Sequence, residues 1–117
     1  MRVDAHLHTL FSDGKLTVSQ LIKRCENRNV KVMAITDHDT VKGVIHWKKS
    51  MENSITVIPG IELSAYSSTQ PQIHITGYFP ISSDFIAIES YLSDHVKQIR
   101  YLFFHSLMIE RIDVKRS

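Results

Sequence analysis

Strand-like and helix-like patterns alternate along the first part of the chain, and this alternation limits the folds that the sequence can adopt. Residues 2–8 alternate apolar and polar side chains, as a half-buried strand does. Residues 17–28 begin with a capping box and carry apolar residues at helical spacing. Residues 30–36 form a mostly apolar second strand, and a capped helix is expected over 40–51. This order predicts an α/β fold with parallel strands.

The later part of the chain continues the pattern and then changes. A third β-rich run covers residues 55–63, and residues 67–71 are polar and typical of a turn. Residues 72–79 alternate again, which predicts a fourth strand. From Ser83 a helical pattern runs nearly to the end of the sequence. We therefore expect strands and helices over residues 1–82 and a helical continuation over 83–117.

The composition is that of an ordinary globular protein and excludes several classes of function. Its 43% hydrophobic and 22% charged residues exclude collagen-like and intrinsically disordered chains. A net charge of +2 is too small to indicate nucleic-acid binding by bulk charge. The single cysteine, Cys25, excludes an internal disulfide and a thiolate zinc site and fits a reducing compartment. No signal peptide or membrane span is recognisable, so we expect a cytoplasmic protein.

The length limits how complete such a fold can be. A closed (β/α) barrel needs about 250 residues, and this chain has 117. The last residues contain no Gly or Pro stop signal, so the sequence is expected to end inside an element of a truncated barrel. The exposed edges of an incomplete barrel would favour self-association.

Seven histidines are unusual for this length, and several stand where strands are predicted to end. His6 and His8 lie two residues apart on the first strand, so both imidazoles leave the same face. Asp13 follows in a turn, and an Asx-turn residue is its alternative interpretation. His38 lies just past the second strand, flanked by two aspartates, and a helix-capping turn is the alternative there.

The third and fourth strands add two more ionisable residues. Glu62 stands between apolar neighbours, and a carboxylate in that setting must be paired, bound to a metal or turned to a polar cavity. His74 lies on the polar face of the fourth strand, where an internally hydrogen-bonded histidine is the alternative. Imidazole and carboxylate without thiolate favour Zn, Mn or Fe. Such ligands around more than one ion are typical of phosphoryl-transfer sites.

These segments resemble a known family. Five short segments are similar to the first four motifs of the PHP (polymerase and histidinol phosphatase) domain, in order and over about residues 2–79: DAHLHT at 4–9 with SDG at 12–14, ITDHDT at 35–40, PGIELS at 59–64 and IHITGY at 73–78. The resemblance is greatest to stand-alone PHP phosphoesterases that act on nucleoside 3′,5′-bisphosphates and short RNA 5′ ends. It implies a distorted (β/α) TIM-like barrel, of which this chain would be the N-terminal part.

The resemblance also implies a catalytic site of six residues that holds up to three divalent ions, Mn, Zn or Fe. By motif, His6 and His8 would hold the first ion, Asp13 and His38 the second and His74 the third, with Glu62 bridging two of them. Asp37 and Asp39 would orient the ligands. The implied function is hydrolysis of phosphate monoesters, nucleotide bisphosphates or short RNA.

The family's remaining ligands, a Cys or His and a late Asp-x-His, have no match in this chain. Among the later residues, His95 and His105 fit neither motif, while Arg100 and Arg111 are candidates to meet a substrate phosphate. One alternative is therefore a catalytically incomplete PHP fragment that folds or acts only with a partner chain. A second alternative, a small nucleic-acid-binding module, depends only on Lys48, its neighbour Lys49 and the basic C-terminus.

Overall fold

The computed structural model describes residues 1–50, 55–67 and 70–95, and the backbone alone at 65–67 and 70–72. Its four strands form one sheet in the order β1-β2-β3-β4. The strands are β1 (Arg2–Leu7), β2 (Val30–Ile35), β3 (Thr56–Ser67) and β4 (Gln70–Tyr78), and the helices between them are α1 (Val18–Asn27) and α2 (Lys42–Ser50).

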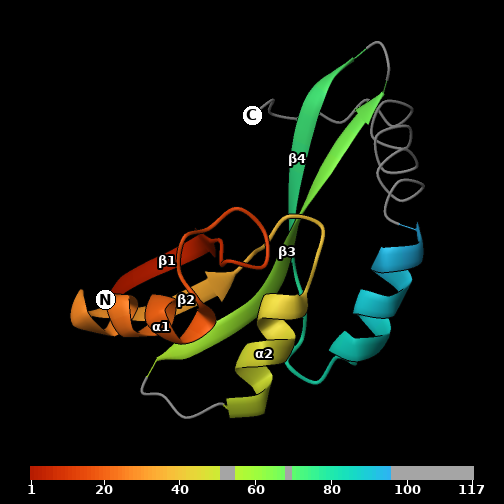
Figure 1. Ribbon diagram of the computed structural model, residues 1–117. Helices are drawn as coiled ribbons and strands as arrows, with labels where there is room; N and C mark the ends of the chain where they lie inside the picture. Colours follow the sequence, from red (N-terminus) through yellow and green to blue (C-terminus); the bar gives the residue numbers. More distant parts are fainter. Residues whose placement is uncertain (51–54, 68–69, 96–117) are drawn as a thin grey trace.

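The first three strands are parallel, as the sequence predicts. Each pair is joined by a helix, and α1 packs against β2 and contacts α2 (Figure 1). The predicted capping box opens α1, where the Thr17 hydroxyl accepts a bond from the Gln20 N–H and the Gln20 side chain accepts one from the Thr17 N–H. Between helices and sheet lies a core that includes Met33 and Ile35 of β2, Val44 and Trp47 of α2, and Cys25 of α1.

The fourth strand departs from the parallel pattern, because β3 and β4 pair antiparallel. Only residues 68–69 separate the two strands, and a parallel crossover needs a dozen residues or more. The backbone ladder extends from the Gly60–Tyr78 pair to the Ser67–Gln70 pair, so the hairpin projects beyond the parallel part of the sheet (Figure 1).

Residues 85–95 form a helix beside α2 (Figure 1). The ammonium of Lys48 on α2 donates to the carbonyls of Ile81 and Ser83, at 2.9 and 3.4 Å, and lies 5.0 Å from the centre of the Phe85 ring. The part of the expected helix beyond residue 95 lies outside the described residues. Among the residues described, none of the helices has the length and apolar character needed to span a membrane.

Candidate metal centre

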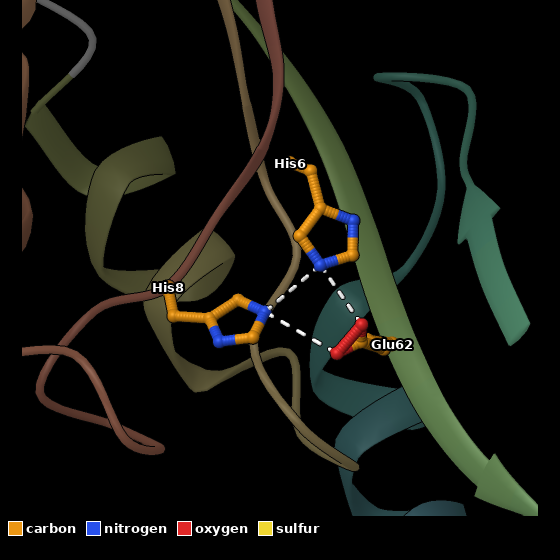
Figure 2. A group of neighbouring side chains, drawn as sticks. All are labelled: His6, His8 and Glu62. Carbon is orange, nitrogen blue, oxygen red and sulfur yellow. Dashed lines mark hydrogen bonds and ion pairs between the residues drawn. The ribbon is translucent and has the colours of Figure 1, made fainter. Parts of the chain in front are cut away.

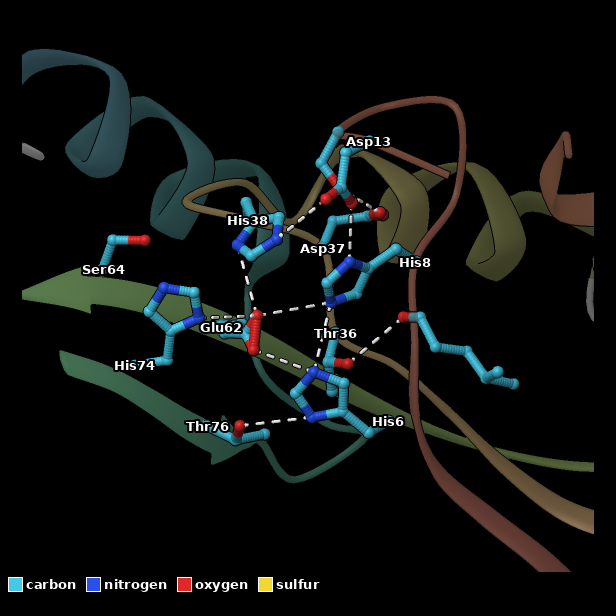
Figure 3. Close-up of polar contacts among 12 residues, drawn as sticks. His6, His8, Asp13, Thr36, Asp37, His38, Glu62, Ser64, His74 and Thr76 are labelled. Carbon is cyan, nitrogen blue, oxygen red and sulfur yellow. Dashed lines mark hydrogen bonds and ion pairs between the residues drawn. The ribbon is translucent and has the colours of Figure 1, made fainter. Parts of the chain in front are cut away.

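The six residues that the sequence singles out lie together where the ends of β1 and β2 meet the β3–β4 hairpin (Figure 3). They come from β1 and the residue after it, the following loop, the turn after β2, and both strands of the hairpin: His6, His8, Asp13, His38, Glu62 and His74. The structure therefore gathers side chains that are up to 68 residues apart in the sequence (74 − 6). Their role as ligands stays a prediction.

Glu62 lies at the centre of the group, and only 4% of the residue is exposed. One carboxylate oxygen is 2.8 Å from Nε2 of His6. The other is 3.5 Å from Nε2 of His8, 3.3 Å from Nδ1 of His38 and 3.5 Å from Nδ1 of His74. Figure 2 shows the His6 and His8 rings directed at this carboxylate, with their two Nε2 atoms 3.2 Å apart.

Asp13 contacts His8 and His38 on the side of these rings away from Glu62. Its two oxygens lie 2.6 Å from Nδ1 of His8 and 3.1 Å from Nε2 of His38. Desolvation opposes ionisation of this carboxyl, but the hydrogen bond from His8 and the charges of His38 and His8 outweigh it, so the pKa of Asp13 lies below its ordinary value. The side chain is 62% exposed, so this carboxylate faces solvent as well as the two rings.

The six side chains form three overlapping groups of three ligand atoms, and the atoms of each group lie within 4.8 Å of one another. Each group shares one residue with each of the others. The groups are His6, His8 and Glu62; His8, Asp13 and His38; and His38, Glu62 and His74. Imidazole nitrogens and carboxylate oxygens at this spacing match the donors that zinc, manganese and iron take in proteins. The donor set therefore fits a divalent cation, and the number of ions stays a prediction.

The backbone after β2 holds Glu62 opposite His38. His38 and Glu62 form a parallel β-bridge outside the regular ladder. The Glu62 N–H donates to the Asp37 carbonyl at 3.0 Å, and the Asp39 N–H donates to the Glu62 carbonyl at 2.9 Å. Asp39 has a φ of 57°, a left-handed conformation that Asp tolerates better than most residues. These backbone bonds fix the position of the His38 main chain, and therefore of its ring, relative to the Glu62 carboxylate.

Asp37 acts on a loop rather than on a histidine ring. The residue is fully buried, and its carboxylate accepts bonds from the Thr9 N–H at 2.6 Å, the Thr9 hydroxyl at 2.7 Å and the Ser12 hydroxyl at 2.8 Å. Through these bonds Asp37 holds the loop that carries Asp13, which folds over the end of β2. Its role in orienting the ligands stays a prediction.

Thr76 is a neighbour of the site to which the sequence interpretation gave no role. Its hydroxyl lies 3.4 Å from Nδ1 of His6, on the opposite side of the ring from Glu62 (Figure 3). Tyr78, two residues further on β4, donates to the Ala5 carbonyl at 2.7 Å. Residues 74, 76 and 78 share one face of a strand, so the alternation that places His74 at the site could have indicated both.

The other described histidines lie apart from the groups of ligand atoms. His46 is exposed on α2 and packs against the Phe11 ring, with 5.9 Å between ring centres. Nδ1 of His95 lies 3.1 Å from the Tyr91 carbonyl on its own helix. His105, Arg100 and Arg111 lie outside the described residues.

Comparison with protein families matches residues 4–105 to the PHP domain. This chain belongs to the PHP domain family. The match includes all six residues of the site, and the family resemblance drawn from the motifs is confirmed.

Two curated relatives are similar to parts of this PHP chain. The 5′-3′ exoribonuclease Rnm of Salmonella typhimurium is 36% identical over a 92-residue alignment, which covers 72% of this chain and 31% of the relative. The phosphoribosyl 1,2-cyclic phosphate 1,2-diphosphodiesterase of Eggerthella lenta is 36% identical over a 76-residue alignment, which covers 63% of this chain and 29% of the relative. The chain thus spans about a third of the length of the curated relatives it matches.

A solved structure shares the fold. A protein from Bifidobacterium adolescentis assigned as a metal-dependent phosphoesterase superposes with a TM-score of 0.63 and 28% sequence identity, over 79% of this chain and 32% of that one. The expected fold class is confirmed: the PHP chain has the mixed α/β arrangement of part of a phosphoesterase barrel.

Proposed function

We propose that this chain takes part in hydrolysis of phosphoesters, using divalent cations held by His6, His8, Asp13, His38, Glu62 and His74. One observation carries the proposal: the three groups of ligand atoms overlap through shared residues, as a multinuclear centre requires. The phosphoester chemistry is supported by the relatives, whose names describe an exoribonuclease and a phosphodiesterase, and by the metal dependence assigned to the structural neighbour.

The surroundings of Glu62 support a bound cation. A buried carboxylate is costly unless it is paired, hydrogen-bonded or bound to a cation. Glu62 and Asp13 offer carboxylate oxygens to such a cation, and the four rings offer nitrogen donors. Mn, Zn or Fe ions at this position would supply a nucleophilic hydroxide and neutralise charge on the phosphoryl oxygens.

The chain's own residues determine how a phosphoester reaches the site. The side chains of His6 and Asp13 are 46% and 62% exposed, whereas those of His8, His38 and His74 are 19–24% exposed. Among the six residues, His6 and Asp13 are therefore the ones that solvent and a substrate phosphate would reach most readily. The Asp37 carboxylate holds the loop that carries Asp13, and the bonds around Asp39 hold His38, so both residues are oriented before substrate binds.

The motifs favour nucleoside 3′,5′-bisphosphates and short RNA 5′ ends as substrates, and the exoribonuclease relative is consistent with RNA. The activity of the relatives belongs to proteins about three times as long as this chain, so these substrates are part of the proposal. The cytoplasmic location and the division at residue 82 stay predictions.

The test begins with metal-free protein and adds Mn²⁺, Zn²⁺ or Fe²⁺ to assays with a nucleoside bisphosphate, a 5′-phosphorylated oligoribonucleotide and a simple phosphate monoester. His38→Ala removes a residue shared by two groups and should abolish hydrolysis. His46→Ala changes an exposed histidine on α2 and should leave it unchanged. Activity that survives chelation, or that is equal in the two variants, would refute the proposal.

A second candidate function is that the chain acts only with a partner chain. The observation in its favour is apolar exposure: Val3 at the β1 edge is 54% exposed, and Ile86 and Tyr91 on the last described helix are 69% and 58% exposed. Sedimentation combined with metal analysis separates the two candidates. A stable monomer that retains two or three ions and hydrolyses substrate alone would contradict the need for a partner.

A further inference from the structure

A carboxylate from the helix at 85–95 caps the N-terminal end of α2. The Glu89 carboxylate accepts bonds from the Thr40 hydroxyl at 2.7 and 3.0 Å and from the Val41 N–H at 2.7 Å. The Thr40 hydroxyl in turn accepts a bond from the Lys42 N–H at 3.1 Å. A negative charge at the N-terminal end of a helix is favourable, and here a residue 49 positions away in the chain supplies it.

Asp39 and Thr40 form the turn between His38 and α2, called here the Asp39 turn. Strand β3 holds this turn from the side opposite Glu89. The Asp39 N–H donates to the Glu62 carbonyl at 2.9 Å, and the Asp39 carboxylate accepts a bond from the Ser64 N–H at 3.3 Å. Asp39 adopts a φ of 57°, and a non-glycine residue keeps such a conformation only where its surroundings hold it. The turn is therefore fixed between β3 on one side and Glu89 on the other.

His38 is the residue immediately before this turn, and its ring belongs to two of the three groups of ligand atoms. Glu89 bonds to Thr40, two residues after His38, and to Val41. A shift of Thr40 would thus be transmitted through Asp39 to the His38 backbone. We infer that Glu89 is a positioning residue, which sets the place of His38 in the metal centre through the Asp39 turn.

This inference rests on the proposed metal-binding function and adds a residue to it. The competing explanation is that Glu89 only fastens the 85–95 helix to the rest of the fold. The two explanations differ in what a loss of the carboxylate should change. A fastening role would affect stability alone, whereas a positioning role would also affect the binding of ions that use His38.

The experiment compares Glu89→Ala with a variant that weakens the same helix elsewhere. Asp84 precedes that helix, and its carboxylate accepts a bond from the Ala87 N–H at 3.1 Å, so Asp84→Ala removes a helix cap without touching the Asp39 turn. Co²⁺ added to metal-free protein serves as the probe, because its visible absorption reports both affinity and ligand geometry. We expect Glu89→Ala to weaken Co²⁺ binding about tenfold and to change the spectrum, as loss of a residue that orients a ligand does.

Two further measurements sharpen the test. Glu89→Gln keeps an oxygen that can accept the Val41 N–H and should restore most of the Co²⁺ affinity. Amide hydrogen exchange on metal-free protein reports the turn directly, and the Asp39 N–H should exchange faster in Glu89→Ala than in Asp84→Ala.

The outcomes are separable. Equal losses of Co²⁺ affinity in Glu89→Ala and Asp84→Ala, or no loss in either, would overturn the positioning role. Unchanged exchange of the Asp39 amide in Glu89→Ala would overturn it without reference to metal. A native chain that binds no Co²⁺ would instead refute the proposed function, and with it any role of Glu89 toward ions.

Discussion

Four imidazole rings surround the carboxylate of Glu62, which is almost inaccessible to solvent. Glu62 belongs to two of the three groups of ligand atoms, so under the proposed function its carboxylate would serve more than one ion. Replacing it with an amide of nearly the same shape separates the effect of charge from that of packing.

Glu62→Gln should therefore lower Mn²⁺ affinity at least about tenfold and phosphoesterase activity at least about 100-fold, since metal-assisted stabilisation is worth several kcal/mol. Calorimetric titration of metal-free protein with Mn²⁺ measures the first effect, and initial rates measure the second. Glu26→Gln, near the end of α1, is the control and should bind Mn²⁺ as the native chain does. Equal Mn²⁺ binding by the two variants would show that Glu62 holds no ion.

Cys25 is packed in the core, as its helical spacing predicts. Burial of the thiol and the negative charge of Asp4 raise its pKa, and the Arg28 charge opposes them only in part. The folded chain should consequently react with iodoacetamide at pH 8 at least about tenfold more slowly than the urea-unfolded chain.

The raised pKa of Cys25 also fixes the sign of a pH effect on stability. The thiol's contribution is complete below the unfolded pKa of about 8.5 and is lost as pH rises through the higher folded value. Between pH 7 and pH 10, the free energy of unfolding should fall more in the native chain than in Cys25→Ala. Equal alkylation rates in the folded and unfolded chain would contradict the burial of this thiol.

The sequence predicted which residues gather at the site but not all of their contacts. His6, His8 and His38 could be placed together because parallel strands end at one edge of a sheet. The bonds of Asp37 to Thr9 and Ser12 could not be predicted, since they depend on how a loop folds over a strand 25–28 residues away. The pattern at the level of residues thus indicates proximity, while the partner of each polar atom requires the fold.

At the level of elements, the capping box of α1 offers a direct test of local structure. Thr17→Ala removes the hydroxyl that accepts the Gln20 N–H and should lower the free energy of unfolding by about 1 kcal/mol, measured by urea denaturation. Ser19→Ala on the exposed face of the same helix is the control and should be neutral or slightly stabilising, because alanine favours helix. A loss equal in both variants would argue against the cap.

Gly43 allows α2 to pack closely against Asp37 and Thr9, beside the proposed metal centre. A Cβ at this position would lie 2.4 Å from a carboxylate oxygen of Asp37, which is fully buried and held by Thr9 and Ser12. Alanine in a helix usually gains about 1 kcal/mol over glycine, but overpacking costs about 1–3 kcal/mol, and here it also disturbs the Asp37 bonds.

Gly43→Ala should therefore lower the free energy of unfolding and weaken Mn²⁺ binding. Gly77→Ala is the matched control, because a Cβ there would meet its nearest neighbour, a methyl group of Ile61, only at 3.9 Å. Chemical denaturation and Mn²⁺ titration of both variants measure the two effects. A Gly43→Ala protein as stable as the native chain would mean that Asp37 can move without cost.

The lengths of the hairpin strands β3 and β4 could not be predicted from the sequence. The polar residues 67–71 predict a turn, yet β3 extends to Ser67 and β4 begins at Gln70. The polar composition locates the turn, but the extent of backbone pairing between β3 and β4 determines where each strand ends. This length matters for the site, because the hairpin carries both Glu62 and His74.

At the scale of the whole molecule, the proposed centre joins all the strands of the described sheet, because its residues lie on β1, β3 and β4 and in the segments that follow β1 and β2. Ions bound there would cross-link strands that are not all neighbours in the sheet. Ion binding and global stability should for this reason be linked, and the linkage can be measured without any substrate.

Mn²⁺ at 100 times its dissociation constant should stabilise the folded chain by about 2.7 kcal/mol, which corresponds to a rise in Tm of about 10 °C. Thermal scans of metal-free and Mn²⁺-loaded protein measure this rise, and EDTA should reverse it. Thr17→Ala should lower Tm with and without Mn²⁺ yet keep the rise, because the cap does not touch the centre. His38→Ala and Glu62→Gln should lose most of it. The same rise in all three variants would place the bound ions elsewhere in the molecule, and the absence of a rise in the native chain would remove the link between this cluster and metal.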